Sequence, residues 1–194
     1  MLSGKRQKFT NMEKTIGKEL SFLSANSWTA LSLVFGLVAA VFVANNGFIT
    51  GAGIFLIAAM CDAVDGAVAR YSKTASKGGA YLDTIADRYV EFFIIAGLFF
   101  SALPDFLLSI KFWLLFYMFG AMMTTYAKAA AKEKGLIKEE MRHGILERAE
   151  RLSLLFLGIL LAALNVRYLT YIIVLLAVLT NITALQRIRK AFQG

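Results

Sequence analysis

The stretch CDAVDGAVARYSKTASKGGAYLDTIADRYVE, residues 61–91, places charged side chains inside two otherwise apolar segments. The first segment carries small and charged residues at offsets of 0, 3, 4, 7 and 8, namely Asp62, Asp65, Gly66, Ala69 and Arg70. The second carries Gly79, Asp83 and Asp87 at offsets of 0, 4 and 8. Residues at these spacings lie on one face of a helix. Two such helices packed antiparallel would bring four carboxylates together near one end.

These carboxylates predict a metal site. Each ionised group inside a bilayer costs at least about 2.5 kcal/mol, and Arg70 and Arg88 offset only part of the negative charge. A set of oxygen ligands favours Mg²⁺, Mn²⁺ or Ca²⁺, and two cations that share carboxylates suit a site that handles phosphates. The alternative is that the aspartates form interhelical salt bridges or an ion-transport path.

The composition of the whole chain indicates a membrane protein. Of its 194 residues, 58% are hydrophobic, whereas soluble domains are about 45–50% apolar. This excess excludes an ordinary soluble domain and intrinsic disorder. A net charge of +8 favours cytoplasmic loops and anionic lipid over nucleic acid as the partner. One cysteine, Cys61, and one histidine, His143, exclude an intramolecular disulfide and a histidine-ligated metal centre.

Six apolar segments are long enough to cross a hydrocarbon core of roughly 30 Å, which takes about 20 residues each. We expect an all-α integral membrane protein whose six transmembrane helices form one membrane domain, residues 26–194. The predicted spans are 27–45, 48–70, 79–101, 106–129, 151–166 and 167–188.

Residues 1–25 predict an amphipathic helix that lies in the membrane interface ahead of this domain. Apolar side chains recur there at spacings of three and four, at Phe9, Met12, Ile16, Leu20 and Leu23. Lys14 and Lys18 fall off that stripe. A frayed basic tail is the alternative.

Basic residues predict how the chain is oriented in the membrane. They concentrate in the N-terminal arm, in residues 70–78 and 128–151, and at the C-terminus, while only Lys111 and Arg167 fall on the other side. Because lysine and arginine are enriched in cytoplasmic loops, both termini and the second and fourth connections should be cytoplasmic. We therefore expect a multi-pass protein of the cell membrane with its active site facing the cytoplasm.

The pattern D-x-x-D-G-x-x-A-R, eight residues, then G-x-x-x-D-x-x-x-D resembles the signature of the CDP-alcohol phosphotransferases, and every specified position is present from Asp62 to Asp87. The resemblance in architecture covers nearly the whole chain. It implies two divalent cations, Mg²⁺ or Mn²⁺, and a homodimer. The implied metal ligands are Asp62, Asp65, Asp83 and Asp87. Asp87 is also the implied catalytic base for the acceptor hydroxyl.

The same resemblance implies a binding site for a CDP-activated lipid, CDP-archaeol or CDP-diacylglycerol. The residues that would contact it are Asn26, Thr29, Asp65, Gly66, Ala69, Arg70, Gly79 and Asp83. Asn26 and Thr29 belong to SANSWT, residues 24–29, which is similar to a T-P-N-x-x-T element of the family except that Ala25 replaces the proline. Asn26 or Ser27 as a simple helix N-cap is an equally good interpretation.

The acceptor is indicated by YAKAAAKEKG, residues 126–135, and HGILERAERL, residues 143–152. These resemble the subgroup that transfers to inositol 1-phosphate, although Ala130 stands where an arginine is often found. A phosphorylated acceptor needs extra fixed cations. The candidates are Lys128, Arg148, Arg151 and Arg187. Alternatively, Glu147 and Arg151 form a common exposed helix pair and the basic residues only set the topology.

Taken together, the residues and the resemblance predict an enzyme of phospholipid biosynthesis. It would transfer a phosphatidyl-type group, with an archaetidyl group preferred, from a CDP-activated lipid to inositol 1-phosphate and release CMP. One alternative keeps this chemistry with glycerol 3-phosphate or serine as the acceptor. An alternative of a different class is an ion-coupled transporter that uses the intramembrane aspartates.

Overall fold

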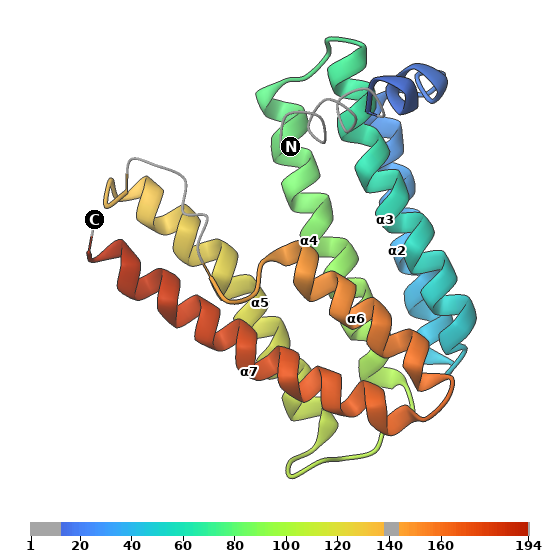
Figure 1. The fold of residues 1–194 in the computed structure, drawn as a ribbon, viewed down its shortest axis with the longest axis vertical. Coiled ribbons are helices and arrows are strands. Elements are labelled where there is room, and N and C mark those ends of the chain that lie inside the picture. Colours follow the sequence, from blue (N-terminus) through green and yellow to red (C-terminus); the bar gives the residue numbers. More distant parts are fainter. Residues whose placement is uncertain (1–12, 138–143, 194) are drawn as a thin grey trace, which may run out of the picture. The chain divides into compact units, whose positions relative to one another are not determined.

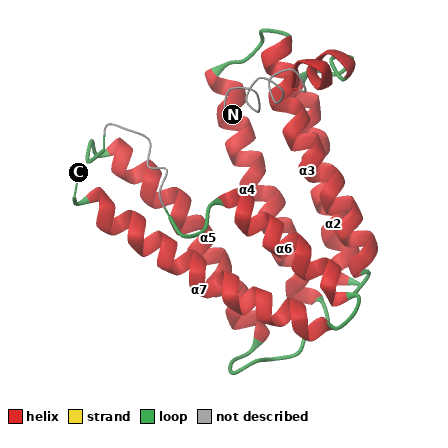
Figure 2. Ribbon diagram, in the orientation of Figure 1, coloured by secondary structure: helices red, strands yellow, loops and turns green. Residues whose placement is uncertain are grey.

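The computed structural model describes residues 13–137 and 144–193, and within these ranges the chain is helical apart from its connections (Figure 2). The helices are labelled in Figure 1 and are α2 Ala25–Ala44, α3 Phe48–Tyr71, α4 Lys77–Phe100, α5 Ile110–Glu133, α6 Arg148–Ala162 and α7 Val166–Ala191. The prediction of an all-α protein is confirmed. The first 12 residues of the predicted interfacial helix, together with Lys138, Arg142 and His143, lie outside the described residues.

Each of the six segments predicted as a span contains a helix, and the largest shifts are at both ends of α5 and at the end of α6. We expected a span from residue 106, but α5 begins at Ile110. Ser109 is its N-cap, with a side chain that accepts from the Lys111 amide, and the Asp105 carboxylate accepts from the Ile110 amide at 2.8 Å. Leu107 has a φ of 58°, which a right-handed helix does not allow. In α6, Glu147 and Glu150 form a capping box that starts the helix at Arg148 rather than at residue 151.

Three of the described helices, α2, α3 and α7, are long and apolar enough to cross a membrane. Many of their large apolar side chains are exposed, among them Val34, Leu56 and Leu175. Exposed apolar surface of this kind suits contact with lipid. The protein is therefore an all-helical membrane protein, and the count of six spans stays a prediction.

The contacts divide the chain into two compact units, which are described separately. Unit 1 comprises residues 13–39 and 53–94 of the described chain, and so contains most of α2, α3 and α4. Gly36 on α2 lets that helix approach α4, because a Cβ at this position would lie 3.2 Å from both methyl groups of Val90. Residues 13–19, which precede α2, are helical, and Lys14 and Lys18 are exposed.

Unit 2 comprises residues 40–52 and 95–193 of the described chain and is built around α5, α6 and α7. Helices α5 and α7 cross closely at Gly120, where a Cβ would come within 2.6 Å of the Asn181 side chain. Small residues permit such close crossings in membrane proteins. The Asn181 amide also donates to the Phe116 carbonyl at 2.9 Å, so a polar bond fixes the crossing. Leu114, Leu155 and Ile173 complete a fully buried core.

Candidate active site

Three of the four aspartates of the sequence motif form one cluster in unit 1. Asp62 comes from α3, and Asp83 and Asp87 come from successive turns of α4. One carboxylate oxygen from each lies within 4.8 Å of the others, and all three side chains are half-buried. Because the spacing of four residues stacks Asp83 above Asp87 on one helix face, a single facing residue from α3 completes the cluster.

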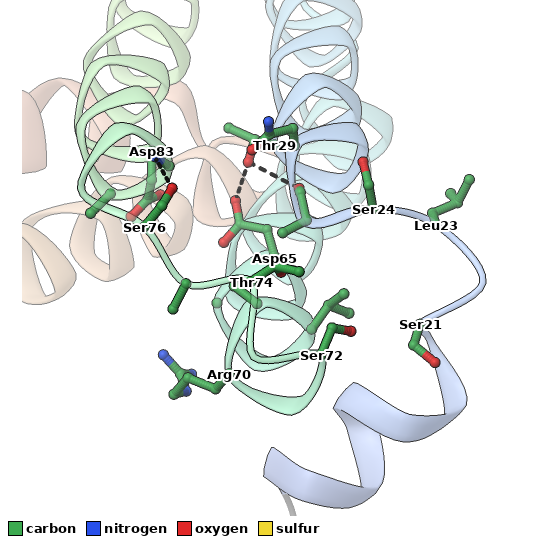
Figure 3. Close-up of a pocket in the computed structure, with 18 of the residues that line it drawn as sticks. Ser21, Leu23, Ser24, Thr29, Asp65, Arg70, Ser72, Thr74, Ser76 and Asp83 are labelled. Atoms are coloured by element: carbon green, nitrogen blue, oxygen red, sulfur yellow. Dashed lines mark hydrogen bonds between the residues drawn. The ribbon is translucent and has the colours of Figure 1, made fainter.

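The fourth motif aspartate, Asp65, is held by a different partner. Its carboxylate accepts a 2.6 Å hydrogen bond from the Thr29 hydroxyl of α2, and the residue is only 5% exposed. Figure 3 shows the two side chains pointing toward one another. A buried carboxylate is costly without hydrogen-bond donors, so Thr29 stabilises Asp65 in place and ties α2 to α3.

A cavity of about 570 Å³ lies beside the cluster. Every residue predicted to contact the CDP-lipid lines this cavity. These are Asn26, Thr29, Asp65, Gly66, Ala69, Arg70, Gly79 and Asp83. Asp83 belongs to both the cavity and the carboxylate cluster. The structure thus brings the polar faces of α3 and α4 and the start of α2 around one space (Figure 3).

Hydroxyl groups form a further part of the cavity wall that sequence reasoning missed. Ser72, Thr74 and Ser76 come from the connection between α3 and α4, and Ser21 and Ser24 come from the segment before α2. Ser76 also accepts a hydrogen bond from the Gly79 amide at 3.0 Å, close to the start of α4. The signal available in the sequence was the density of hydroxyl residues directly after Arg70.

The hydrogen bonds at the start of α2 show which residue is the N-cap of this helix. Ser24, rather than Asn26 or Ser27, is in the capping position, because its hydroxyl accepts a hydrogen bond from the Ser27 amide at 3.1 Å. The interpretation of Asn26 or Ser27 as the N-cap is therefore wrong. Asn26 is left to line the cavity.

A buried ion pair follows the carboxylate cluster along α4. Arg88 lies 3.0 Å from Glu91, and their side chains are 14% and 2% exposed. Sequence reasoning named Arg88 only as a poor counter-charge and did not single out Glu91. The available signal was that Glu91 follows Asp83 and Asp87 at the same interval of four residues, so it extends their face of the helix.

The residues predicted to bind the acceptor lie in unit 2. Arg151 is 2% exposed, and Arg187 donates to the Thr124 carbonyl at 2.7 Å. Arg187 lies close enough to Glu147 and Arg151 to interact with the charge of both. Arg148 and Lys128 are half-buried on α6 and α5. The structure therefore brings Arg151 and Arg187 together at neighbouring ends of α6 and α7.

The connection that leads into α6 is fastened to α7. The Leu146 amide donates to the Thr183 hydroxyl and the Ile145 amide donates to the Gln186 side chain, each at 3.2 Å. Gly144 is needed there because a Cβ would lie 2.5 Å from the Thr183 methyl group.

The start of α6 also corrects the alternative that Glu147 and Arg151 form an exposed pair. Arg151 is buried, and the Glu147 side chain is used in the capping box with Glu150. The capping box satisfies the amides of Glu147 and Glu150, and Arg148, Arg151 and Arg187 supply the positive charge of this region.

The sequence of the chain is similar to a known protein family and to several known proteins. A family model described as CDP-alcohol phosphatidyltransferase matches residues 22–183. The chain is 30% identical to an archaetidylinositol phosphate synthase of Pyrococcus horikoshii, with 98% of this chain and 96% of that protein covered. It is 29% identical to an archaetidylinositol phosphate synthase of Methanothermobacter thermautotrophicus, with 88% and 84% covered.

The fold is also similar to a solved structure. The phosphatidylinositol phosphate synthase of Mycobacterium tuberculosis, in complex with manganese and citrate, superposes with a TM-score of 0.81 at 25% identity. The match covers 93% of this chain and 88% of that one.

Proposed function

This chain belongs to the CDP-alcohol phosphatidyltransferase family, and we propose that it transfers a phosphatidyl-type group, preferably an archaetidyl group, from a CDP-activated lipid to inositol 1-phosphate. CMP is the second product. The chain is a transferase of phospholipid biosynthesis. No comparison supports the alternative of an ion-coupled transporter.

One observation carries this proposal: three carboxylates converge beside a cavity lined by the motif residues. Oxygen atoms within 4.8 Å of one another, with no histidine or thiolate among them, fit the ligand preference of Mg²⁺ or Mn²⁺. Asp62, Asp83 and Asp87 would hold divalent cations, with Asp65 as the fourth ligand of a two-metal site. When bound, the cations offset the negative charge of the pyrophosphate and of the leaving CMP.

The chemistry assigned to the protein's own residues is simple. Asp87 accepts the proton of the acceptor hydroxyl, and the resulting oxygen forms a bond to the lipid-bearing phosphorus as the bond from that phosphorus to CMP breaks. Arg70 and the helix surfaces left open by Gly66 and Gly79 bind the CDP group. Thr29 orients Asp65 through their 2.6 Å hydrogen bond.

The hydrocarbon part of the donor also finds a suitable surface in unit 1. A second cavity of about 260 Å³ shares Asn26 and Thr29 with the first, and its wall continues over Leu33, Ile85 and Tyr89. A polar cavity beside an apolar one suits a molecule with a charged headgroup and hydrocarbon chains. The shared lining residues support a lipid donor that enters from the bilayer.

The acceptor assignment depends on the basic residues of unit 2. Lys128, Arg148, Arg151 and Arg187 would bind the phosphate of inositol 1-phosphate, because arginine matches phosphate geometry through paired donors. Burial of Arg151 and the hydrogen bond of Arg187 to Thr124 support this assignment, since both side chains are already ordered.

We further propose the arrangement of the protein in its membrane. Six spans form the domain at residues 26–194, residues 1–25 lie in the interface, and both termini and the active site face the cytoplasm. Two copies form a homodimer. The distribution of lysine and arginine supports the orientation, and three helices already meet the length and composition of a span.

The experiment that tests the proposal measures CMP release by purified protein in detergent with Mg²⁺ or Mn²⁺ and CDP-archaeol or CDP-diacylglycerol. The acceptor panel is inositol 1-phosphate, free inositol, glycerol 3-phosphate and serine. We expect turnover with inositol 1-phosphate alone. Turnover with another acceptor would support the reaction and refute the acceptor assignment. If no acceptor in the panel gave CMP release, the proposed function would be refuted.

A further inference from the structure

The segment that precedes α2 is attached to the wall of the large cavity in unit 1. Gly17 meets α3 so closely that a Cβ there would lie 2.6 Å from the Ala67 carbonyl oxygen and 2.7 Å from the Tyr71 Cβ. The Trp28 indole donates to the Leu20 carbonyl at 3.0 Å, which fixes the other end of the segment to α2. Residues 21–24 then line the cavity itself. The helical turns at residues 13–19 therefore have a defined position over the end of α3.

Arg70 connects this segment to the cavity. Its NH2 group donates to the Glu13 carboxylate at 2.9 Å, and the side chains of the two residues are 57% and 31% exposed. Its NH1 group lies over the backbone of Gly66, 3.1 Å from where a Cβ would stand. Both Arg70 and Gly66 line the cavity. One side of the guanidinium is thus held by Glu13 while the other faces the surface left open by the glycine.

We propose that Glu13 is a positioning residue for Arg70, which it holds over Gly66 ready to receive the diphosphate of the nucleotide. A free arginine side chain samples many rotamers, and ordering it on binding reduces affinity. The contact with Glu13 fixes the guanidinium before the ligand arrives and leaves the NH1 donors available. This inference rests on the proposed function, because it takes the nucleotide of a CDP-activated lipid as the ligand.

The sign of the effect distinguishes positioning from a simple charge effect. Glu13 is anionic, so its removal should strengthen the binding of any anion by reducing repulsion. If Glu13 instead positions Arg70, its removal weakens binding. Glu19 provides a matched control, since it carries the same charge in the same segment and is exposed.

The test measures the equilibrium binding of CDP to the purified protein in detergent with Mg²⁺, for the unaltered chain, Glu13→Ala and Glu19→Ala. From the range for partly exposed ion pairs we expect Glu13→Ala to raise the Kd by about two- to fivefold. Glu19→Ala should leave the Kd unchanged or lower it. Glu13→Gln, which keeps a hydrogen-bond acceptor, should fall between Glu13→Ala and the unaltered chain.

A double mutant separates positioning from a merely structural role. In an Arg70→Ala background, Glu13→Ala should leave the Kd unchanged or lower it, whereas damage to the fold would raise the Kd beyond that of Arg70→Ala. In turnover assays Glu13→Ala should raise the KM for the CDP-lipid, while its kcat stays within about twofold of that of the unaltered chain. Equal or tighter CDP binding by Glu13→Ala would overturn the inference. Absence of CDP binding by the unaltered protein would overturn the proposed function as well.

Discussion

The carboxylate cluster of unit 1 and the basic region of unit 2 are built in different ways. Asp83 and Asp87 stand on one helix, four residues apart, and Asp62 faces them from the helix directly before it in the chain. The arginines of unit 2 instead depend on contacts between α5, the connection before α6, and α7, such as the hydrogen bond from Arg187 to Thr124. The first site therefore needs one contact between helices that follow each other in the chain, whereas the second needs contacts between segments that lie far apart in the chain.

The largest effect should come from the periodic site. Asp87→Asn removes the proposed base and one negative metal ligand, so we expect CMP release to fall by about 10²- to 10⁴-fold with every acceptor. A CMP release assay with the four-acceptor panel measures this loss. Asp105→Asn is the matched control, because that carboxylate lies outside the motif and accepts from the Ile110 amide at the start of α5. Retained turnover in Asp87→Asn would remove Asp87 from the mechanism.

A smaller and more selective effect should come from the basic region. Arg148→Gln removes a positive charge without emptying the space, and a lost charge-assisted hydrogen bond corresponds to roughly a 10- to 100-fold change. We expect the KM for inositol 1-phosphate to rise by this factor while the KM for the CDP-lipid is unchanged. Steady-state kinetics with each substrate varied in turn would measure this split. Arg189→Gln, an exposed change near the end of α7, serves as the control, and an equal rise of both KM values would contradict the division between the two regions.

The smallest effect tests whether tertiary contacts tune the basic region. A Gly144→Ala side chain would meet the Thr183 methyl group at 2.5 Å, so the connection before α6 must shift. We expect the KM for inositol 1-phosphate to rise a few-fold, on the order of 1 kcal/mol of overpacking. Thr183→Ser removes that methyl group and keeps the hydroxyl that accepts from Leu146. Adding Thr183→Ser to Gly144→Ala should return the KM for inositol 1-phosphate to that of the unaltered chain. If the KM stayed raised, the connection before α6 would not tune acceptor binding.

The same contrast explains how much could be predicted from the sequence. Helix positions and the shared face of Asp83 and Asp87 follow from the length of apolar segments and from a spacing of four residues. The contacts of Thr29 with Asp65 and of Glu13 with Arg70 join residues 36 and 57 positions apart. Local patterns carry no information about such pairs. The burial of Arg151 was missed for the same reason, because the spacing from Glu147 is equally typical of an exposed pair.

Small departures at helix ends have a similar cause. The start of α5 depends on Ser109 as the N-cap and on the Asp105 carboxylate, and the start of α6 depends on the Glu147 and Glu150 capping box. Hydropathy locates the apolar part of a helix but does not distinguish which nearby polar side chain takes the capping position. Ser24 at the start of α2 is a third example.

The crossing of α5 and α7 at Gly120 has a consequence for biosynthesis. Asn181 reaches back 65 residues to the Phe116 carbonyl, so α5 obtains this partner only after α7 has been made. Every residue of unit 1, by contrast, lies within the first 94 positions. Because chains emerge from the ribosome N-terminus first, the carboxylate cluster has all its parts long before the basic region does, and the basic region can form only once α7 has been made.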